Sequence, residues 1–284
     1  MERITLADSA GFCFGVKRAV DTALHIKEKC NNEIYTLGPL IHNNDVVDFL
    51  KENLIFPIEI ESIASLKEND TIIIRSHGVS EKTLNILKKN NLNIIDATCP
   101  YVENIHKKVK KYYDLGYSII IVGDKNHPEV IGINGWCNDS AVILKSGTEP
   151  CSISNKVCVV SQTTERQSTW EAVLTKIIKT SKEIVAFNTI CSATEVRQKS
   201  AEELSNKVDA MVVIGGFNSS NTTKLYEICK KNCKKTVHVE NLLGIPDEFI
   251  KDKTIKNIGV TAGASTPDWI IRDAILKMND NRSK

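Results

Sequence analysis

Several catalytic signatures are missing from this sequence of 284 residues. It contains no G-x-x-x-x-G-K-[ST] phosphate loop and no convincing G-x-G-x-x-G turn, so neither a nucleoside triphosphatase nor a nicotinamide-dependent enzyme is supported. The G-x-S-x-G elbow of hydrolases and the H-E-x-x-H helix of metalloproteases are also missing. No C-x-x-C pair occurs among the nine cysteines, which argues against a zinc site built from close pairs.

Signals for export, membrane insertion and nucleic-acid binding are equally scarce. The first residues enter a strand pattern without a basic segment, an apolar core or a cleavage site, and no apolar run approaches transmembrane length. The net charge is +2, the isoelectric point is about 8.0 and aromatic residues make up 6% of the chain, so composition indicates no nucleic acid or membrane partner. We therefore expect a cytoplasmic protein, in whose reducing surroundings cysteines are free thiols or metal ligands.

Short apolar runs rich in β-branched residues alternate with amphipathic stretches along the whole chain. This alternation predicts an α/β protein whose parallel-leaning sheets are covered by helices. With 42% hydrophobic residues, the chain is long enough for two or three domains. Strands are expected at 3–7, 34–37, 71–75, 93–96, 118–122, 141–144, 157–160, 210–214, 237–239 and 258–261, and helices at 82–89, 170–179 and 223–231 among others.

Three of the nine cysteines share one local pattern. Cys13, Cys99 and Cys191 each lie between a strand-like and a helix-like run, 86 (13 to 99) and 92 (99 to 191) residues apart. This spacing suits a small α/β unit, so we interpret the chain as three similar units. A helix start stabilises a thiolate, the form that attacks carbon or binds metal. The other six are interpreted as filler or surface thiols, namely Cys30, Cys137, Cys151, Cys158, Cys229 and Cys233.

Small polar residues and histidines follow five of the predicted strands. Each group alone is typical of turns and helix N-caps. Ligands of parallel sheets gather at the carboxyl ends of the strands, however, so five such groups together indicate an anion pocket suited to phosphate oxygens. The groups are Ser76, His77 and Gly78; His127, Pro128 and Glu129; Ser161, Gln162, Thr163 and Thr164; Ser219, Ser220 and Asn221; and Thr261, Gly263 and Ser265, to which the loop residue His42 is added.

Three thiolates that meet at one centre could hold zinc or an iron-sulfur cluster. Structural zinc usually takes four protein ligands, whereas only three equivalent cysteines are found here. A missing fourth ligand leaves one metal position open. A 4Fe–4S cluster held by three cysteines would present one iron to a substrate, where it could act as Lewis acid and electron donor.

A set of short motifs, taken in order, resembles the 4-hydroxy-3-methylbut-2-enyl diphosphate reductase family. The motifs are GFCFGVKRAV, HNNDVV, SHGVS, DATCP, HPEV, SQTT, NSSN and TAGAS, and the resemblance extends over essentially the whole chain. It implies three similar α/β domains in a pseudo-threefold cloverleaf around one central 4Fe–4S cluster, with Cys13, Cys99 and Cys191 as ligands. The implied domains are residues 12–98, residues 99–190, and residues 191–284 together with the N-terminal strand within 1–11.

The same resemblance implies a reaction, the last step of the methylerythritol phosphate route to isoprenoids. Two electrons and two protons remove the substrate hydroxyl as water, giving isopentenyl and dimethylallyl diphosphates, and an external donor such as a ferredoxin or flavodoxin supplies the electrons. Glu129 is implied as proton source, with His127 as a further catalytic residue, and Thr163 as the residue that orients the hydroxyl-bearing end. The implied substrate-binding residues are His42, His77, His127, Thr163, Ser219, Ser220, Asn221 and Ser265.

Two other classes of protein fit the residues less well. A non-enzymatic electron carrier could bind the cluster, but it would have no use for histidine, serine and asparagine loops around an open iron. A zinc-stabilised structural or nucleic-acid-binding protein would need a fourth ligand and usually a basic face with many aromatic residues. We therefore expect an enzyme.

Overall fold

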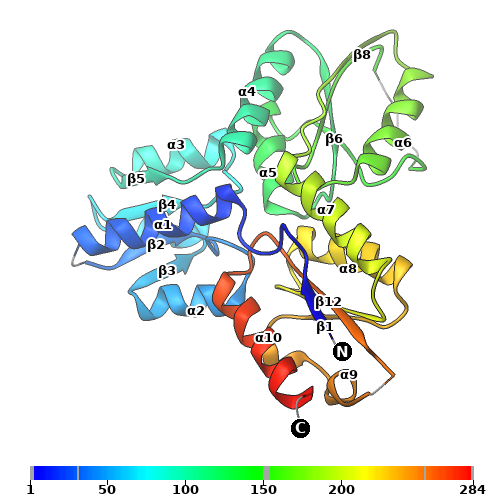
Figure 1. The fold of residues 1–284 in the computed structure, drawn as a ribbon. Helices are drawn as coiled ribbons and strands as arrows, with labels where there is room; N and C mark the ends of the chain where they lie inside the picture. Colours follow the sequence, from blue (N-terminus) through cyan, green and yellow to red (C-terminus); the bar gives the residue numbers. More distant parts are fainter. Residues whose placement is uncertain (1–2, 31, 150–153, 253, 283–284) are drawn as a thin grey trace. The chain divides into compact units, whose positions relative to one another are not determined.

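The computed structural model of the chain describes residues 3–30, 32–149, 154–252 and 254–282. Within these ranges, strands and helices alternate from end to end (Figure 1). The strands form three parallel sheets of four strands each. The predicted α/β class and the parallel sheets are therefore confirmed.

The three sheets share one strand order. The first sheet contains β3 (Ile55–Ile58), β2 (Ile34–Leu37), β4 (Thr71–Ile74) and β5 (Asn93–Asp96), and the second contains β7 (Val142–Leu144), β6 (Ser118–Val122), β8 (Lys156–Ser161) and β9 (Glu183–Ala186). The third contains β11 (Thr236–Val239), β10 (Ala210–Ile214), β12 (Asn257–Ala262) and β1 (Arg3–Leu6). The N-terminal strand β1 thus holds in the third sheet the edge position that β5 and β9 hold in the other two.

Helices follow most of the strands, and local sequence explains where several begin and end. Ser80 accepts a hydrogen bond from Thr83 N at 3.1 Å and so caps α3, Pro100 and Pro128 occupy first-turn positions, and Gly116 follows α4 with φ +79°. The helices are α1 (Phe14–Lys29), α2 (Asn44–Glu52), α3 (Glu81–Lys89), α4 (Pro100–Asp114), α5 (Pro128–Asn134), α6 (Gln167–Ile178), α7 (Ser192–Ser205), α8 (Ser220–Asn232), α9 (Asp247–Lys251) and α10 (Asp268–Arg282), with 3-10 turns η1 (Ile60–Ser65), η2 (Gly135–Cys137) and η3 (Leu242–Gly244).

Central strands are buried on both faces, which explains their nearly continuous apolar sequences. In β6, Ile119 and Ile121 pack with residues of α4 and α5, whereas Ile120 and Val122 pack with residues of α6 on the other face. A shift of register by one residue would exchange these two sets, so the packing of both faces fixes the register. Among the described helices, none combines the length and the apolar character that crossing a bilayer requires.

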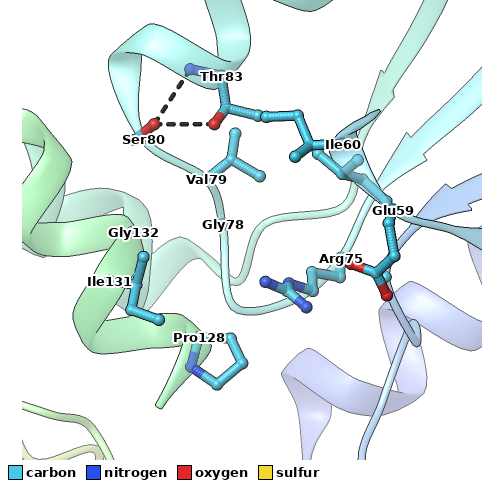
Figure 2. Close-up of a pocket in the computed structure, with 12 residues that line it drawn as sticks. Glu59, Ile60, Arg75, Gly78, Val79, Ser80, Thr83, Pro128, Ile131 and Gly132 are labelled. Carbon is cyan, nitrogen blue, oxygen red and sulfur yellow. Dashed lines mark hydrogen bonds between the residues drawn. The ribbon is translucent and has the colours of Figure 1, made fainter. Parts of the chain in front are cut away.

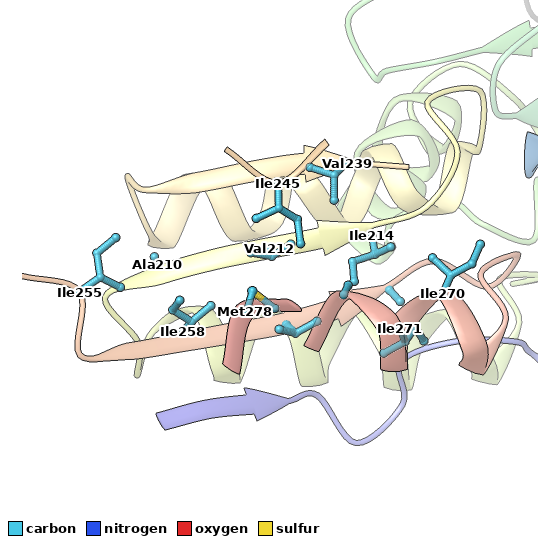
Figure 3. Packing of buried hydrophobic residues seen from close by; sticks show 13 residues of the cluster. Ala210, Val212, Ile214, Val239, Ile245, Ile255, Ile258, Ile270, Ile271 and Met278 are labelled. Carbon is cyan, nitrogen blue, oxygen red and sulfur yellow. The ribbon is translucent and has the colours of Figure 1, made fainter. Parts of the chain in front are cut away.

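The third sheet has the same two-faced packing (Figure 3). On one face Val212 and Ile214 of β10 lie in a cluster with Ile270 of α10, and on the other face Met211 and Val213 lie in a cluster with residues of α8. Fully burying each of these side chains contributes about 1.5–3 kcal/mol. The strand ends that carry the predicted polar loops therefore project from rigid, well-packed sheets.

The chain forms two compact units. Unit 1 comprises Met1–Val16, Ile41–Val46 and Ser192–Lys284, and unit 2 comprises Lys17–Leu40 and Val47–Cys191. The first and second sheets belong to unit 2 and the third sheet belongs to unit 1. The division into three domains at the boundaries given above stays a prediction.

Candidate active site

The three cysteines singled out in the sequence follow corresponding strands. Cys13 follows β1, Cys99 follows β5 and Cys191 follows β9, each an edge strand of its sheet. The neighbouring strand ends in a polar loop, and a carbonyl there accepts a hydrogen bond from the cysteine backbone N–H. The acceptors are Ala264 O for Cys13 (3.1 Å), Ser76 O for Cys99 (2.9 Å) and Thr163 O for Cys191 (3.0 Å). This repeated bond holds each cysteine against the loop that carries predicted substrate residues.

Cys99 is the N-cap residue of α4, with φ −60° and ψ 133°. Thr98 N donates to Asp96 Oδ1 at 2.8 Å in the preceding turn, and Arg18 Nη1 donates to Thr98 O at 2.9 Å. The cysteine is half-buried. Because the first turn of a helix presents unpaired N–H groups and the positive end of its dipole, this position favours a thiolate.

Cys13 and Cys191 have similar surroundings, since α1 begins at the residue after Cys13 and α7 at the residue after Cys191. Val16 N lies 3.5 Å from Cys13 Sγ and donates to it. Two residues before Cys13, Gly11 O accepts a bond of 2.8 Å from Nη2 of the buried Arg197. Arg18 and Arg197 are not among the residues predicted from sequence. Their only signal there is an arginine in the first two turns of a helix that follows a candidate cysteine.

The other described cysteines differ from these three. Burial raises the pKa of the Cys158 and Cys229 thiols to about 12 and also raises that of Cys137. Such thiols are protonated at neutral pH and serve as core residues. Cys233 is buried directly after α8, and Cys30 is half-buried. Cys151 lies outside the described residues.

Glu129 and Thr163 form a buried pair within unit 2. Glu129 is only 2% exposed, Thr163 N donates to its Oε1 at 2.6 Å, and Thr163 Oγ1 donates to its Oε2 at 2.8 Å. Both carboxylate oxygens are therefore held in place. Since Thr163 O accepts the N–H of Cys191, one threonine connects the candidate acid to a candidate ligand.

His77 and His127 lie edge to face in unit 2, with ring centroids 5.4 Å apart. His127 is the N-cap residue of α5, and its Nδ1 accepts from Glu129 N at 3.1 Å. With Nδ1 acting as acceptor, the ring hydrogen of neutral His127 is on Nε2. The histidine can therefore donate a hydrogen bond from Nε2 without giving up its cap.

The remaining predicted substrate residues belong to unit 1. Ser265 Oγ donates to His42 O at 3.1 Å, which links the loop after β12 to the His42 loop. Ser219 caps α8 by accepting from Thr222 N at 3.4 Å, and Ser220 is the first residue of that helix. Asn221 is 3% exposed, and neither Oδ1 nor Nδ2 has a hydrogen-bond partner among the described residues. Its amide is therefore available to bond a water molecule or a ligand.

Unit 2 thus contains one part of the predicted site and unit 1 the other. Unit 2 holds Cys99, Cys191, His77, His127, Glu129 and Thr163, and unit 1 holds Cys13, His42, Ser219, Ser220, Asn221 and Ser265. All of these residues lie in loops or helix starts that follow parallel strands, where α/β enzymes carry their active sites. The fold is α/β, and its polar side chains, among them the buried Glu–Thr pair, lie where an enzyme of this class would carry its active site.

Comparisons with known proteins identify the family. The family model for LytB proteins matches residues 4–279. The chain is 61% identical to the 4-hydroxy-3-methylbut-2-enyl diphosphate reductase of Clostridium perfringens over 99% of this chain and 100% of that one. It is 64% identical to the reductase of the same name from Clostridium tetani over 98% of this chain, but it spans only 44% of that protein.

A solved structure described as (E)-4-hydroxy-3-methyl-but-2-enyl diphosphate reductase, the terminal enzyme of the non-mevalonate pathway, has 40% identity and a TM-score of 0.71, covering 99% of this chain and 100% of that chain. The chain therefore belongs to the LytB family of 4-hydroxy-3-methylbut-2-enyl diphosphate reductases, a family of oxidoreductases. The resemblance inferred from the ordered motifs is confirmed.

Proposed function

We propose that the protein removes the hydroxyl group of 4-hydroxy-3-methylbut-2-enyl diphosphate reductively, yielding isopentenyl and dimethylallyl diphosphates. Substrate, two electrons and two protons are consumed, and one product molecule and one water are released. The observation that carries this proposal is the hydrogen bond repeated in all three sheets, which attaches each candidate cysteine to a loop carrying substrate-binding candidates.

Only three of the described cysteines begin a helix after a strand, whereas structural zinc usually takes four protein ligands, so the residues fit an iron-sulfur cluster better. Cys13, Cys99 and Cys191 are half-buried at helix starts, whereas Cys137, Cys158 and Cys229 are buried thiols with raised pKa values. We assign the first three as ligands of one 4Fe–4S cluster. When bound, such a cluster supplies electrons and, at an iron without a cysteine ligand, Lewis acidity.

Glu129 is our candidate for the proton donor. The N–H and O–H of Thr163 hold its carboxyl group in one orientation, and burial keeps competing water away from it. When Glu129 is protonated, its O–H can donate to the departing hydroxyl oxygen, and the Thr163 hydroxyl can rotate to support the same oxygen. His127 is the second candidate proton donor, because it caps the helix whose first turn contains Glu129.

The diphosphate is assigned to the histidine, serine and asparagine residues of the strand-end loops. Asn221 supports this assignment because its buried amide can donate and accept hydrogen bonds without breaking a bond to the protein. Ser219 and Ser220 lie at the N-terminus of α8, where N–H groups and the helix dipole favour anions. We assign His42, His77, His127, Thr163 and Ser265 to the same substrate.

Three further proposals concern the protein's surroundings. A ferredoxin or flavodoxin supplies the electrons, because no redox group other than the proposed cluster is implied in the protein. The protein works in the cytoplasm without nucleic acid or membrane partners, which agrees with eight described cysteines that are free thiols. The three-domain division rests on the three sheets of equal strand order.

The substitution Glu129→Gln tests the catalytic assignment. Glutamine keeps the size of the side chain and can still contact Thr163, but it cannot deliver a proton. We expect single-turnover reduction with a chemical reductant to slow by about a hundred- to ten-thousandfold, with cluster content and substrate affinity unchanged. Glu171→Gln, on the exposed side of α6, is the matched control and should react normally. Normal turnover with a lowered melting temperature would assign Glu129 a structural role and leave His127 as the donor.

A further inference from the structure

A cavity of about 230 Å³ lies in unit 2, next to the loops that follow β4 and β6. Its lining includes Arg75 at the end of β4, the backbone of Gly78, and Pro128 and Ile131 of α5 (Figure 2). None of the residues assigned above to substrate or cluster is among those that line it. The cavity is therefore separate from the proposed active site, although Gly78 follows His77 and Pro128 follows His127 in the chain.

Arg75 is the positively charged residue of this cavity, and Glu59 is its negatively charged one. The Arg75 guanidinium makes no hydrogen bond and no ion pair with any residue in the described part of the chain, and its Nε is buried without a partner. Its Nη1 would lie only 2.6 Å from a Cβ at Gly38, so the guanidinium rests against a glycine that leaves room for it. Arg197, by contrast, donates to two backbone carbonyls.

Arg75 is half-buried, and its buried Nε lacks a hydrogen-bond partner, which is costly for the folded protein. Burial lowers the pKa of Arg75, and the carboxylate of Glu59 opposes this only in part. Figure 2 shows the guanidinium directed toward Pro128 and Ile131, with Glu59 at the other end of the Arg75 side chain. An anion in the cavity could therefore reach the guanidinium from the side that Glu59 leaves open.

Apart from Arg75 and Glu59, the lining is mainly apolar. Leu37, Ile60, Val79, Pro128 and Ile131 contribute to the walls, and the hydroxyls of Ser80 and Thr83 are engaged with each other at 2.9 Å. The volume lies between the roughly 150 Å³ that holds a benzene molecule and the roughly 300 Å³ at which sites for drug-sized ligands begin. The size and the walls suit an apolar body of about five carbon atoms.

We propose that this cavity is a second ligand site, which binds a small organic anion: a phosphate or carboxylate group on Arg75 with a short branched apolar body against Ile60 and Ile131. A guanidinium pairs with either head group through two parallel hydrogen bonds. Five-carbon phosphates, which belong to the proposed reaction, and short branched carboxylates, which do not, share this chemistry.

Methyl NMR on the full chain, purified anaerobically with its cluster, tests the proposal. The δ1 methyl groups of the isoleucines are labelled, and 3-methylbutanoate or 3-methylbutyl phosphate is titrated in separate arms. We expect saturable shifts of the Ile60 and Ile131 methyl signals with at least one probe, and the tighter of the two identifies the head group. The uncharged 3-methylbutan-1-ol should bind about tenfold or more weakly, because it lacks the charge-assisted hydrogen bonds.

Two variants make the test specific. Arg75→Gln should weaken binding about tenfold or more, while Arg272→Gln, which removes an exposed arginine from α10, should leave it unchanged. If Arg75→Gln does not fold, Ile131→Trp, which fills the cavity from a side chain that is 53% exposed, replaces it and should abolish the shifts. Equal affinity for the anionic probes and for 3-methylbutan-1-ol would refute the proposal. Unaltered binding in Arg75→Gln or Ile131→Trp would refute it as well. The readout needs no turnover, so its outcome is independent of the proposed reaction.

Discussion

His106 should make the folded state sensitive to acid, because the burial of its imidazole outweighs the effect of the nearby carboxylates. It lies on α4, is 5% exposed, and stacks on Trp136 with ring centroids 5.3 Å apart. Its Nε2 has no hydrogen-bond partner among the described residues. Trp136 Nε1 in turn donates to Val79 O at 2.9 Å, so the two rings support the segment that follows His77.

The magnitude follows from the pKa of His106, which burial lowers from 6.5 to about 4 while the carboxylates of Asp96 and Glu103 counteract the shift. The unfolded chain binds the proton near pH 6.5, so protonation favours unfolding. This contribution to stability is complete above pH 6.5 and is lost as the pH falls toward 4. Its full size is about 3 kcal/mol, of which about 2 kcal/mol is lost between pH 7 and pH 5.

The perturbation is His106→Gln, which removes the titrating ring. Free energies of unfolding are measured by urea titration at several pH values between 5 and 7.5. Subtracting the value of the variant from that of the wild type removes the contribution of the carboxylates, which both proteins share. We expect this difference to change by about 2 kcal/mol across the range. His25→Gln, at a side chain that is 62% exposed on α1, is the matched control. A difference constant to within about 0.5 kcal/mol would refute the reasoning, as would an NMR titration of the His106 ring near pH 6.5.

Three other predictions concern the cluster, the loop after β4 and the substrate. Cys99→Ser should lose iron, sulfide and turnover together, whereas Cys30→Ser should keep them, and full iron content in the first variant would contradict the ligand assignment. Gly78→Ala should lower stability by about 3 kcal/mol because φ is +69° and the new Cβ would lie 2.5 Å from His106 Cε1, while Gly116→Ala, with φ +79° and open space, should cost about 1 kcal/mol in matched thermal melts. By calorimetry, isoprenoid diphosphates should bind far more tightly than the corresponding alcohols, and equal affinities would mean that the loops are ordinary turns.

Strands with continuous β-branched runs are predicted from sequence to within about one residue, as at 34–37, 93–96, 118–122 and 210–214. The strand β3 is not among the predicted ones, since Pro57 interrupts its short apolar run. Proline removes a backbone donor and is tolerated only at a sheet edge, which is where β3 lies. Edge position depends on the rest of the sheet and cannot be read from four residues.

Only those parts of the candidate site that depend on local sequence are predicted. Cysteines and polar residues at strand ends follow from the alternation of strands and helices, and the ordered motifs connect them to a family. The hydrogen bond from Arg197 to Gly11 spans 186 positions in the chain, and the position of the Arg75 guanidinium depends on the missing side chain at Gly38. Neither leaves a periodic or compositional signal, because both arise from contacts between distant segments.

The pairing of β1 with β12 has a consequence for synthesis on the ribosome. Arg3 pairs with Asn257, so β1 can join its sheet only after about 250 further residues have been translated. At typical rates of 5–20 residues per second, that interval is about 13 to 50 seconds. During it, the strand carries unpaired N–H and C=O groups and the adjoining Cys13 is separated from its acceptor at Ala264. The third sheet can thus be completed only after β12 has been made. Of the three candidate ligands, Cys13 is therefore the last whose backbone hydrogen bond can form.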